Sequence, residues 1–577
     1  MRGNNKTILH FLTLSVSVLA ISLPASAQNT EPALRQADPG RVEQQLPSPD
    51  FNLKDDIPDI RIPGGAAVKA PEGAENVMVT LREIHFEGVT VYGPGQLKPL
   101  YADKIGEKIA LTEVFAIANE LTLKYRNDGY VLTQVVVPPQ TIDNGIVRLQ
   151  VVEGFIDKVS VQGDESNGAQ LVRDLASKLS NTGPVNIREL ERSLLLINDL
   201  PGVSARSVLS PSRDVTGAAD LTIFIDRDPY DGLVAADNYG SKYLGAFQTS
   251  GALTLNSPFG WNEAITIQAA VTPSYGDKME LGYVALGYSQ PLNAHGTSLE
   301  LAASMSTTAP GYTLEEFDVE GQSGFISVGL RQSIIRTREL NWSARLSFDA
   351  RDVETKNNVD PITKDDRIRA LRVGTRASFL DSFLGLGMNT WDLEISHGLD
   401  VFNSSHDGDA DLSRLEAEDN FWKVEAEMQR LQRLYGPINL LVGVKGQWAT
   451  DALYSSEEMG LGGFATGYGR GYDPSEISGD DAVAAKVEIQ FNNALQFPFV
   501  ETSQLYGFYD VGTVWNKDAA TTDIKRDSIA STGVGTRFGL PHALTADLAL
   551  AIPMTRDVET DEGGHDMRIF FSIGKSF

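Results

Sequence analysis

Hydrophobic and polar residues alternate along the last eleven positions of the chain, which end on an aromatic residue. The apolar positions share one parity and are Met567, Ile569, Phe571, Ile573 and Phe577; the other parity holds Arg568, Ser572, Gly574 and Ser576. Because successive side chains of a strand point to opposite faces, this strand has one apolar face and one small or polar face. That arrangement suits a barrel wall with lipid outside and water inside, although an amphipathic strand of a soluble sandwich would look the same. Two residues break the pattern: Phe570 falls on the inner parity, and Lys575 falls on the outer parity.

The same alternation recurs from about Val234 to the C-terminus, where helical periodicity is absent. Six further segments carry it, at 265–272, 298–305, 327–331, 342–349, 391–395 and 544–552. A soluble sandwich could use this pattern, but it would not usually place arginine and aspartate so regularly opposite the apolar face. Transmembrane strands need ~9–11 residues each, so this length accommodates roughly sixteen strands with their turns. The pattern therefore favours a transmembrane antiparallel β-barrel over 229–577.

The front of the chain predicts export from the cytoplasm. Arg2 and Lys6 precede an apolar run over 8–23, and small residues follow at 25–27 (ASA), so we expect residues 1–27 to be a signal peptide. A short N-terminal anchor is the alternative interpretation. No later stretch holds eighteen or more apolar residues, so a membrane could be crossed after cleavage only by a closed barrel, which pairs every backbone polar group internally.

Residues 28–76 have the composition of a linker that contains one short helix. We expect the helix within 37–46, with Asp38 as its N-cap and Pro39 at its first position. Five prolines, at positions 47, 49, 58, 63 and 71, interrupt the remainder of the linker.

Two copies of one small module lie between 77 and 228, each ordered strand, helix, helix, strand, strand. In the first copy we expect a strand over 77–88 with a bulge near Arg82, helices near 96–105 and over 112–127 with Thr112 as N-cap, and strands over 132–137 and 146–152. In the second copy we expect strands over 156–162, 203–209 and 221–225, and helices over 169–179 and 187–200, the latter opened by Asn186. The same order would fit two generic α+β domains.

Composition and motifs disfavour several classes of function. The net charge of −28 argues against a nucleic-acid partner, and the absence of cysteine excludes disulfides, thiolate metal sites and cysteine nucleophiles. The His-Glu-x-x-His, Gly-x-Ser-x-Gly and phosphate-loop motifs are absent, so we predict no enzyme and no cofactor. Asp407, Asp409, Asp411 and Glu418 imitate the spacing of a calcium loop, but Leu412 stands where glycine is needed, so we predict an acidic surface loop and no metal.

Several motifs resemble the outer-membrane transporters of two-partner (type V) secretion, the TpsB class or ShlB/FhaC/HecB family, which are relatives of the barrel-assembly protein BamA. The segments 125–130 (YRNDGY), 137–140 (VPPQ) and 152–154 (VEG) are similar to the first POTRA domain of that family, and 190–192 (LER) with 198–202 (NDLPG) to the second. The segment 237–240 (DNYG) is similar to the entry of the barrel.

The most specific resemblance lies within the barrel. The segment 456–463 (SEEMGLGG) precedes an Arg-Gly-Tyr tripeptide, which in the family sits at the tip of a loop folded into the barrel, and 508–512 (FYDVG) resembles a strand that the arginine contacts. The functional loop and lumen contact implied by this resemblance are Arg470, Gly471, Tyr472, Phe508, Asp510 and Gly512. Independently of it, Tyr509 and Val511 share the apolar parity, so Asp510 should point inward and need a partner or water. Gly469 stands where the family usually has valine, which puts the packing of the loop tip in doubt.

The resemblance implies a domain order and a function. It predicts a signal peptide over 1–27, a plug helix and linker over 28–76, α+β POTRA domains over 77–154 and 155–228, and a barrel of about sixteen strands over 229–577. The POTRA domains would stand in the periplasm and bind an unfolded TpsA-like exoprotein of the haemolysin or adhesin type. That partner would leave through the barrel, which sits in outer-membrane lipid and is delivered by the barrel-assembly machinery through its last strand, ending at Phe577. A BamA-like insertion factor and a passive pore are the alternatives.

Overall fold

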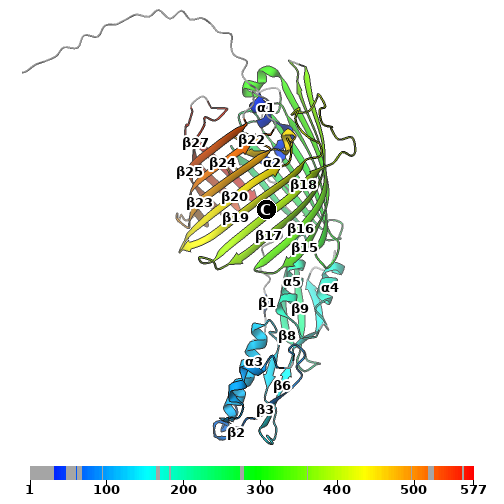
Figure 1. The fold of residues 1–577 in the computed structure, drawn as a ribbon, viewed down its shortest axis with the longest axis vertical. Coiled ribbons are helices and arrows are strands. Elements are labelled where there is room, and N and C mark those ends of the chain that lie inside the picture. The colour runs from blue at the N-terminus through cyan, green and yellow to red at the C-terminus, as the bar shows by residue number, and fades with distance from the viewer. Residues whose placement is uncertain are drawn as a thin grey trace, which may run out of the picture.

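The computed structural model describes residues 31–46, 60–61, 68–93, 95–163, 169–180, 183–272, 278–359, 361–495, 497–517, 525–561 and 564–577. The signal peptide predicted over 1–27 lies outside these residues. The described chain forms a barrel with two small α+β modules strung out one after the other from one of its ends (Figure 1).

Sixteen antiparallel strands close into the barrel, which confirms the predicted architecture. The strands are β10 Tyr230–Asp237, β11 Gln248–Asn256, β12 Ala264–Val271, β13 Leu281–Pro291, β14 Thr297–Thr308, β15 Val319–Arg336, β16 Leu340–Asn357, β17 Ile362–Asp381, β18 Gly387–Gly398, β19 Trp422–Tyr435, β20 Ile438–Ala449, β23 Asp481–Asn492, β24 Thr502–Trp515, β25 Arg526–Leu540, β26 Leu544–Pro553 and β27 Arg568–Ser576. The seam is closed by β10 and β27, in a register that pairs Leu233 with Ser576 and Asp237 with Ser572.

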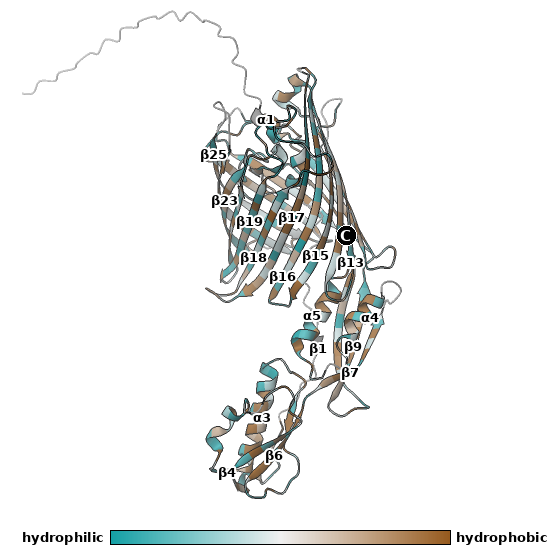
Figure 2. Ribbon diagram, turned by 45° about the vertical axis from the view of Figure 1, so that its right-hand side comes forward, coloured by the Kyte–Doolittle hydropathy of each residue, from teal (hydrophilic) through white to brown (hydrophobic). Residues whose placement is uncertain are grey.

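The burial of the two strand faces distinguishes this barrel from a soluble sandwich. The apolar parity faces outward and is exposed: Leu346 is 47% exposed, Trp391 48% and Ile569 57%. The polar parity is the buried one, as at Ser347 and Asp349. Brown and teal positions accordingly alternate along the barrel strands in Figure 2. A sandwich would bury its apolar face instead, so this surface suits contact with hydrocarbon.

The first module (78–152) differs from its predicted elements at three points. The strand expected over 77–88 is two strands, β2 Met78–Thr80 and β3 Glu83–Glu87, which pair in different sheets, with β4 Lys108–Ala110 and with β6 Ile146–Val152. The helix expected near 96–105 is two 3₁₀ turns, Lys98–Leu100 and Ala102–Lys104. Helix α3 spans Leu111–Asn127 with Ala110 at its N-cap, so Thr112 does not cap it. Strand β5, Gln134–Val136, completes the sheet β3-β6-β5, against which α3 packs.

The second module (155–227) follows its prediction closely. It consists of β7 Phe155–Gly163, α4 Ala169–Ser177, α5 Ile187–Asn198, β8 Val203–Pro211 and β9 Ala218–Arg227. The side chain of Asn186 accepts a hydrogen bond from the Arg188 N–H and caps α5, as predicted. Its four-stranded sheet, ordered β1-β8-β9-β7, includes a strand that the sequence did not predict, β1 Ile60–Arg61.

The N-terminal segment enters the barrel. It forms α1 Glu31–Gln36, a 3₁₀ turn Pro39–Arg41 and α2 Val42–Gln45, and Asp38 caps the turn through the Gly40 N–H, as predicted. Arg41 and Val42 are buried, and the segment lies within the barrel in Figure 1. None of the helices in the described part of the chain is long and apolar enough to cross a membrane.

Candidate functional site: a loop folded into the barrel lumen

The loop between β20 and β23 folds back into the barrel instead of leaving it. It contains a 3₁₀ turn at Ser455–Glu457 and two short strands, β21 Met459–Leu461 and β22 Ile477–Gly479, which pair with each other as a hairpin. Its apolar side chains pack with those of β23, β24 and β25 in one buried cluster. The Arg-Gly-Tyr tripeptide lies between the two hairpin strands and is buried throughout.

The structure brings Arg470 and Asp510 together. The Arg470 Nε donates to Asp510 Oδ2 at 2.9 Å, and Nη2 donates to Oδ1 at 2.8 Å, which is the parallel two-bond geometry of a guanidinium on a carboxylate. The Arg470 backbone N–H adds a third bond to Oδ2 at 3.1 Å. The guanidinium carbon of Arg470 also lies over the face of the Phe508 ring, 3.6 Å from the ring centroid. Asp510 is fully buried and Arg470 nearly so, so each charge depends on the other.

A second carboxylate that the sequence reading missed extends this contact. Glu488 of β23 accepts a short hydrogen bond from Arg470 Nη1 and one of 2.8 Å from Arg537 Nη1. Arg537 in turn pairs with Asp547 of β26, which accepts a bond from the Tyr506 hydroxyl. Glu488 lies on the inner parity between Val487 and Ile489, so alternation could have shown it to face the lumen. Alternation could not show that its partners lie 18 and 49 residues away.

Glycines allow the loop tip to approach the wall. Gly469 has φ +89°, a conformation that a β-branched valine would adopt only with strain, and a Cβ there would lie 2.5 Å from Ile529. The loop tip at Gly469 therefore packs closely against the barrel wall at Ile529. A Cβ on Gly471 would lie 2.9–3.1 Å from Ser531 and the backbone of β26, and one on Gly512 would meet Leu461 of the loop at 2.7 Å.

Tyr472 and Asp473 attach the loop to the segment that precedes the last strand. The Tyr472 hydroxyl accepts hydrogen bonds from the backbone N–H groups of Thr555 and Arg556, at 3.2 and 3.3 Å. Asp473 is fully buried and pairs with Thr560 and with Arg568 of β27. The loop is thus bonded to the strand that closes the barrel.

Phe570, which breaks the alternation of the last strand, packs against the loop. Its ring stacks on Phe464 of the loop at 4.8 Å, and Phe464 also contacts Tyr239 from the DNYG segment at 4.8 Å. Phe464 and Phe570 form one buried cluster with Tyr506 and Phe508, and the partly buried ring of Tyr239 packs against it. The exception to the alternation was therefore a signal of an internal contact.

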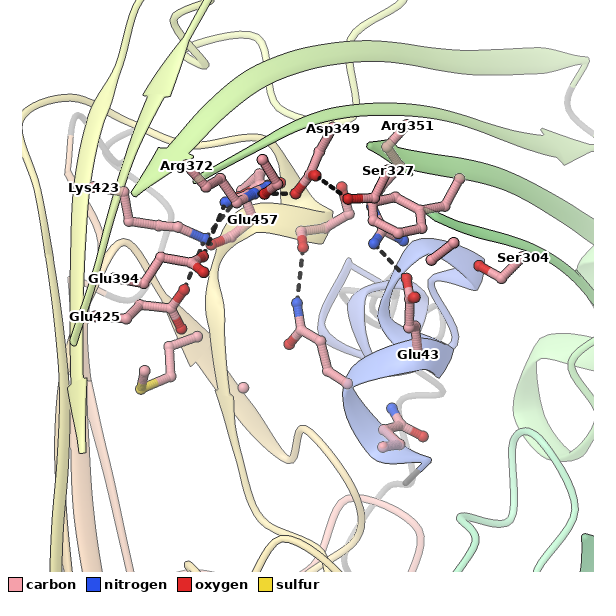
Figure 3. Close-up of a pocket in the computed structure, with 18 of the residues that line it drawn as sticks. Glu43, Ser304, Ser327, Asp349, Arg351, Arg372, Glu394, Lys423, Glu425 and Glu457 are labelled. Atoms are coloured by element: carbon pink, nitrogen blue, oxygen red, sulfur yellow. Dashed lines mark hydrogen bonds and ion pairs between the residues drawn. The ribbon is translucent and has the colours of Figure 1, made fainter. Parts of the chain in front are cut away.

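The remaining lumen contains a polar cavity of about 500 Å³, which is shown in Figure 3. Its wall carries interspersed charges of both signs, among them Arg351, Arg372, Glu394, Lys423 and Glu425. Glu457 of the loop reaches into this wall and pairs with Arg372 at 2.7 Å and with Lys423 at 2.6 Å. On the other side of the cavity, Glu43 of the N-terminal segment pairs with Arg351 at 2.5 Å.

Glu458, next to Glu457, holds the N-terminal segment instead of the wall. Its carboxylate pairs with Arg41 through a short bond and lies 3.7 Å from Arg35 and 2.9 Å from Arg414. The Arg41 Nε also donates to the Ser455 carbonyl at 2.9 Å. Two consecutive glutamates of the loop therefore bind two different parts of the protein, the N-terminal segment and the barrel wall.

The acidic loop with calcium-like spacing uses its carboxylates locally. Asp407 accepts from the Asp419 N–H at 2.8 Å, and Asp409 accepts from the His406 N–H at 2.9 Å. Asp400, His406 and Asp419 could bring three ligand atoms within 4.8 Å of one another, but the first two are exposed and nothing else at this place indicates a ligand.

Comparison with solved structures defines the class. The chain matches CdiB from Escherichia coli with a TM-score of 0.71 at 18% identity, covering 96% of this chain and all of that one. It matches BamA from Haemophilus ducreyi, lacking POTRA domains 1–3, with a TM-score of 0.52 at 12% identity over 86% of this chain. At these identities the likeness concerns the fold, a barrel preceded by POTRA domains. The fold therefore defines the class of the protein as a closed sixteen-stranded β-barrel preceded by POTRA modules.

Sequence comparison gives the family. A model described as "Haemolysin secretion/activation protein ShlB/FhaC/HecB" matches residues 222–538, more than half of the chain, and "POTRA domain, ShlB-type" matches 79–154. The chain belongs to the haemolysin secretion/activation family and is a two-partner secretion transporter. The heme/hemopexin transporter protein HuxB of Haemophilus influenzae (strain 86-028NP) is 23% identical over 80% of this chain and 81% of its own. The outer membrane transporter CdiB of Dickeya dadantii is 23% identical over 78% of this chain and 79% of its own.

Proposed function

We propose that this transporter exports one TpsA-like exoprotein, of the haemolysin or adhesin type, and that the Arg470 loop is the part of the lumen on which export depends. The buried contact of Arg470 with Asp510 and Glu488 carries the proposal, because a solvated pore has no need to bury a charged loop that narrows it. A barrel-insertion factor of the BamA type is the second candidate; it usually carries more POTRA copies than the two modules described here.

The division of labour follows the predicted domain order. Residues 77–154 and 155–228 would bind the unfolded partner in the periplasm, the barrel over 229–577 would conduct it, and the helix within 28–76 would plug the pore at rest. The last strand, ending at Phe577, would be the element that the barrel-assembly machinery recognises, and lipid would cover the outer face. The support for the plug is that Arg41 is fully buried among the lumen-facing groups of the loop.

The export function is tested by surface delivery of the partner. We expect a neighbouring gene to encode a large repeat-rich exported protein, and we expect that protein to reach the cell surface only in strains that contain this chain. Surface immunolabelling of the partner in a deletion strain and in the complemented strain measures this. Normal delivery without the chain would reject the proposal.

Replacing Arg470 by alanine should impair export without preventing barrel insertion. The change leaves Asp510 and Glu488 buried without their shared cation, which costs the docked loop about 3–5 kcal/mol. We expect surface delivery to fall at least tenfold, while the protein still fractionates with the outer membrane and keeps its heat-modifiable mobility on gels. Arg470→Lys keeps the charge but loses the two-bond geometry and should also be impaired.

The matched control is Arg345→Ala. Arg345 also faces the lumen and pairs with a carboxylate, Glu394, but it lies outside the contacts of the loop tip. Delivery close to wild type is expected for this variant. Wild-type delivery by Arg470→Ala would refute a role for the loop.

A further inference from the structure

A row of aromatic and charged side chains lies on the outer face of the barrel, across strands β20, β23 and β24. Trp448 of β20 and Trp515 of β24 are both exposed. Strand β23 runs between them, and its residue Asp481 is the register partner of Trp515. Asp481 shares the parity of the exposed Val483, and its carboxylate accepts a hydrogen bond from the Ala449 N–H, next to Trp448, at 2.9 Å. The two indoles therefore stand on either side of one outward carboxylate.

Each of these two indoles has a basic side chain over its ring. The Lys517 Nζ lies 5.8 Å from the ring centroid of Trp448, and the guanidinium carbon of Arg526 lies 5.6 Å from that of Trp515. Arg526 is the register partner of Trp515 on the neighbouring strand β25. Lys517 is also held by Asp481 at 3.1 Å. Rings and carboxylate together fix where two positive charges lie on the outside of the wall.

The height of this row matches the outer edge of the hydrocarbon. The outward residues of β24 run from Leu505 to Trp515, which at ~3.3 Å per residue is about 33 Å along the strand. A tilt of about 40° reduces this length to a height of about 25 Å, the height of the apolar band of such barrels. Strand β24 runs in the same direction as β10, which begins beside the second module, so Trp515 lies at the end away from the modules (Figure 1). The two basic groups thus lie at the level of the headgroups of the outer leaflet.

The charge of Arg526 is not compensated in the way that a similar cation at the other end of the barrel is. There, Arg430 lies over the Phe383 ring at 5.9 Å, but Asp381 accepts two hydrogen bonds from it, at 2.7 and 2.9 Å. Arg526 forms no ion pair with any acidic residue that the structure describes. In a chain of net charge −28, an uncompensated cation at a fixed place indicates an anionic partner there.

We infer that Trp448, Trp515, Lys517 and Arg526 form a binding site for the phosphorylated headgroup of a lipid of the outer leaflet. The Arg526 guanidinium offers parallel N–H donors to the oxygens of a phosphate, and Lys517 adds a second positive charge. The indoles, at the edge of the apolar band, pack against the apolar part of the same lipid. The site lies outside the lumen and does not depend on the proposed export function.

Lipid binding by the purified full-length protein tests the site. The protein in non-ionic detergent is titrated with lipid A, which carries phosphates, and with phosphatidylcholine, whose headgroup has no net charge; bound copies are counted by native mass spectrometry. We expect the double variant Lys517→Gln, Arg526→Gln to bind lipid A at least tenfold more weakly than wild type, and to bind phosphatidylcholine equally. Arg526→Gln alone should bind lipid A about threefold more weakly, which gives the same test if the double variant does not insert.

The matched control is Lys278→Gln. Lys278 is an exposed cation at the same end of the barrel, but it already pairs with Asp318 and Glu320, both at 2.7 Å. Lipid A binding close to wild type is expected for this variant, and an equal loss in it would show a general effect of charge and overturn the inference.

Two further outcomes would also overturn it. The first is equal affinity of wild type and the Lys517 and Arg526 variants for lipid A. The second is displacement of lipid A by inorganic phosphate in millimolar excess, because a soluble anion would then satisfy the site without a lipid. We expect inorganic phosphate to leave lipid A bound, since the ion cannot contact the apolar faces of the indoles.

Discussion

Two neighbouring glutamates of the folded-in loop contact two different parts of the molecule. Glu457 pairs with Arg372 and Lys423 of the wall, whereas Glu458 pairs with Arg41 of the N-terminal segment. All five side chains are at least nine-tenths buried, so their charges are poorly screened, and the loss of one leaves its partners uncompensated. The wall side of this arrangement is visible around Glu457 in Figure 3.

Neutralising Glu458 should release the N-terminal segment from the pore. Glu458→Gln removes the charge that faces Arg41, Arg35 and Arg414, and a hydrogen bond to a charged group is worth about 1.5–3 kcal/mol. We expect the open-channel probability in planar bilayers to rise by roughly ten- to hundredfold, since each 1.4 kcal/mol is a factor of about ten.

Glu457→Gln is the matched control for that measurement. It changes the neighbouring carboxylate, which contacts the wall and not the N-terminal segment, so channel opening should stay near the wild-type level. Equal opening in the two variants would show that the loop does not hold the segment through Glu458.

At the scale of elements, the sequence predicts what repeats and misses what depends on a distant neighbour. The barrel strands were predictable because lipid and lumen impose a two-residue period on every strand. The split of 77–88 into β2 and β3 was not, because the change of face near Arg82 looks the same for a bulge and for a change of sheet. Strand β1 is too short to show a period at all.

The same limit applies to the candidate site. The inward direction of Asp510 follows from its neighbours Tyr509 and Val511, both exposed to the outside. The identity of its partner, Arg470, was predicted by the resemblance to the family motif and not by the alternation. The contact of Glu488 with Arg470 and Arg537 depends on how the closed barrel sets three strands and a loop against one another, which local sequence does not encode.

In the first POTRA module, one carboxylate joins a loop, a helix and the end of β6. Glu153 accepts from the N–H groups of Thr90 and Val91 at 2.9 and 3.0 Å and from the Tyr125 hydroxyl at 2.7 Å. Burial alone would raise the pKa of Glu153, but a short hydrogen bond from the Thr90 hydroxyl, together with the three bonds above, lowers it below its usual value. The stabilisation is therefore complete above the unfolded-state pKa of about 4.5 and is lost as the pH falls through the lower folded-state pKa.

Replacing Glu153 by glutamine should destabilise this module and remove much of its acid sensitivity. The neutral amide accepts weaker hydrogen bonds and does not titrate, so we expect a loss of about 1–2 kcal/mol at pH 7 and a smaller loss below the folded-state pKa. Hydrogen exchange of the β6 amides in the full-length protein, followed against pH, measures this. Glu120→Gln, an exposed carboxylate of α3, should leave the exchange unchanged. An equally steep acid dependence in Glu153→Gln would contradict the assignment.

At the scale of the whole molecule, the second POTRA module is held to the barrel by a few defined polar contacts. Arg336, the last residue of β15, donates to Asp199 at the end of α5 at 2.7 and 2.9 Å, and its side chain is only 2% exposed. Arg192 donates to the carbonyls of Ser333 and Ile334 at 3.1 and 3.2 Å, and Glu191 lies 3.3 Å from Arg338. These contacts set the module below the barrel in the orientation seen in Figure 1.

Removing the Asp199–Arg336 pair should free the second module to change its orientation. Asp199→Ala and Arg336→Ala each leave one buried charge without its main partner, whereas the double variant leaves neither, so the double variant should be less perturbed than the sum of the two. Spin labels on Ser210→Cys of β8 and Tyr435→Cys, at the exposed end of β19, report the orientation in a chain with no other thiol. We expect a narrow distance distribution in the parent, a broad one in each single variant and an intermediate one in the double variant. Distributions of equal width in all four proteins would mean that other contacts hold the module, and the pair would then have no part in setting its orientation below the barrel.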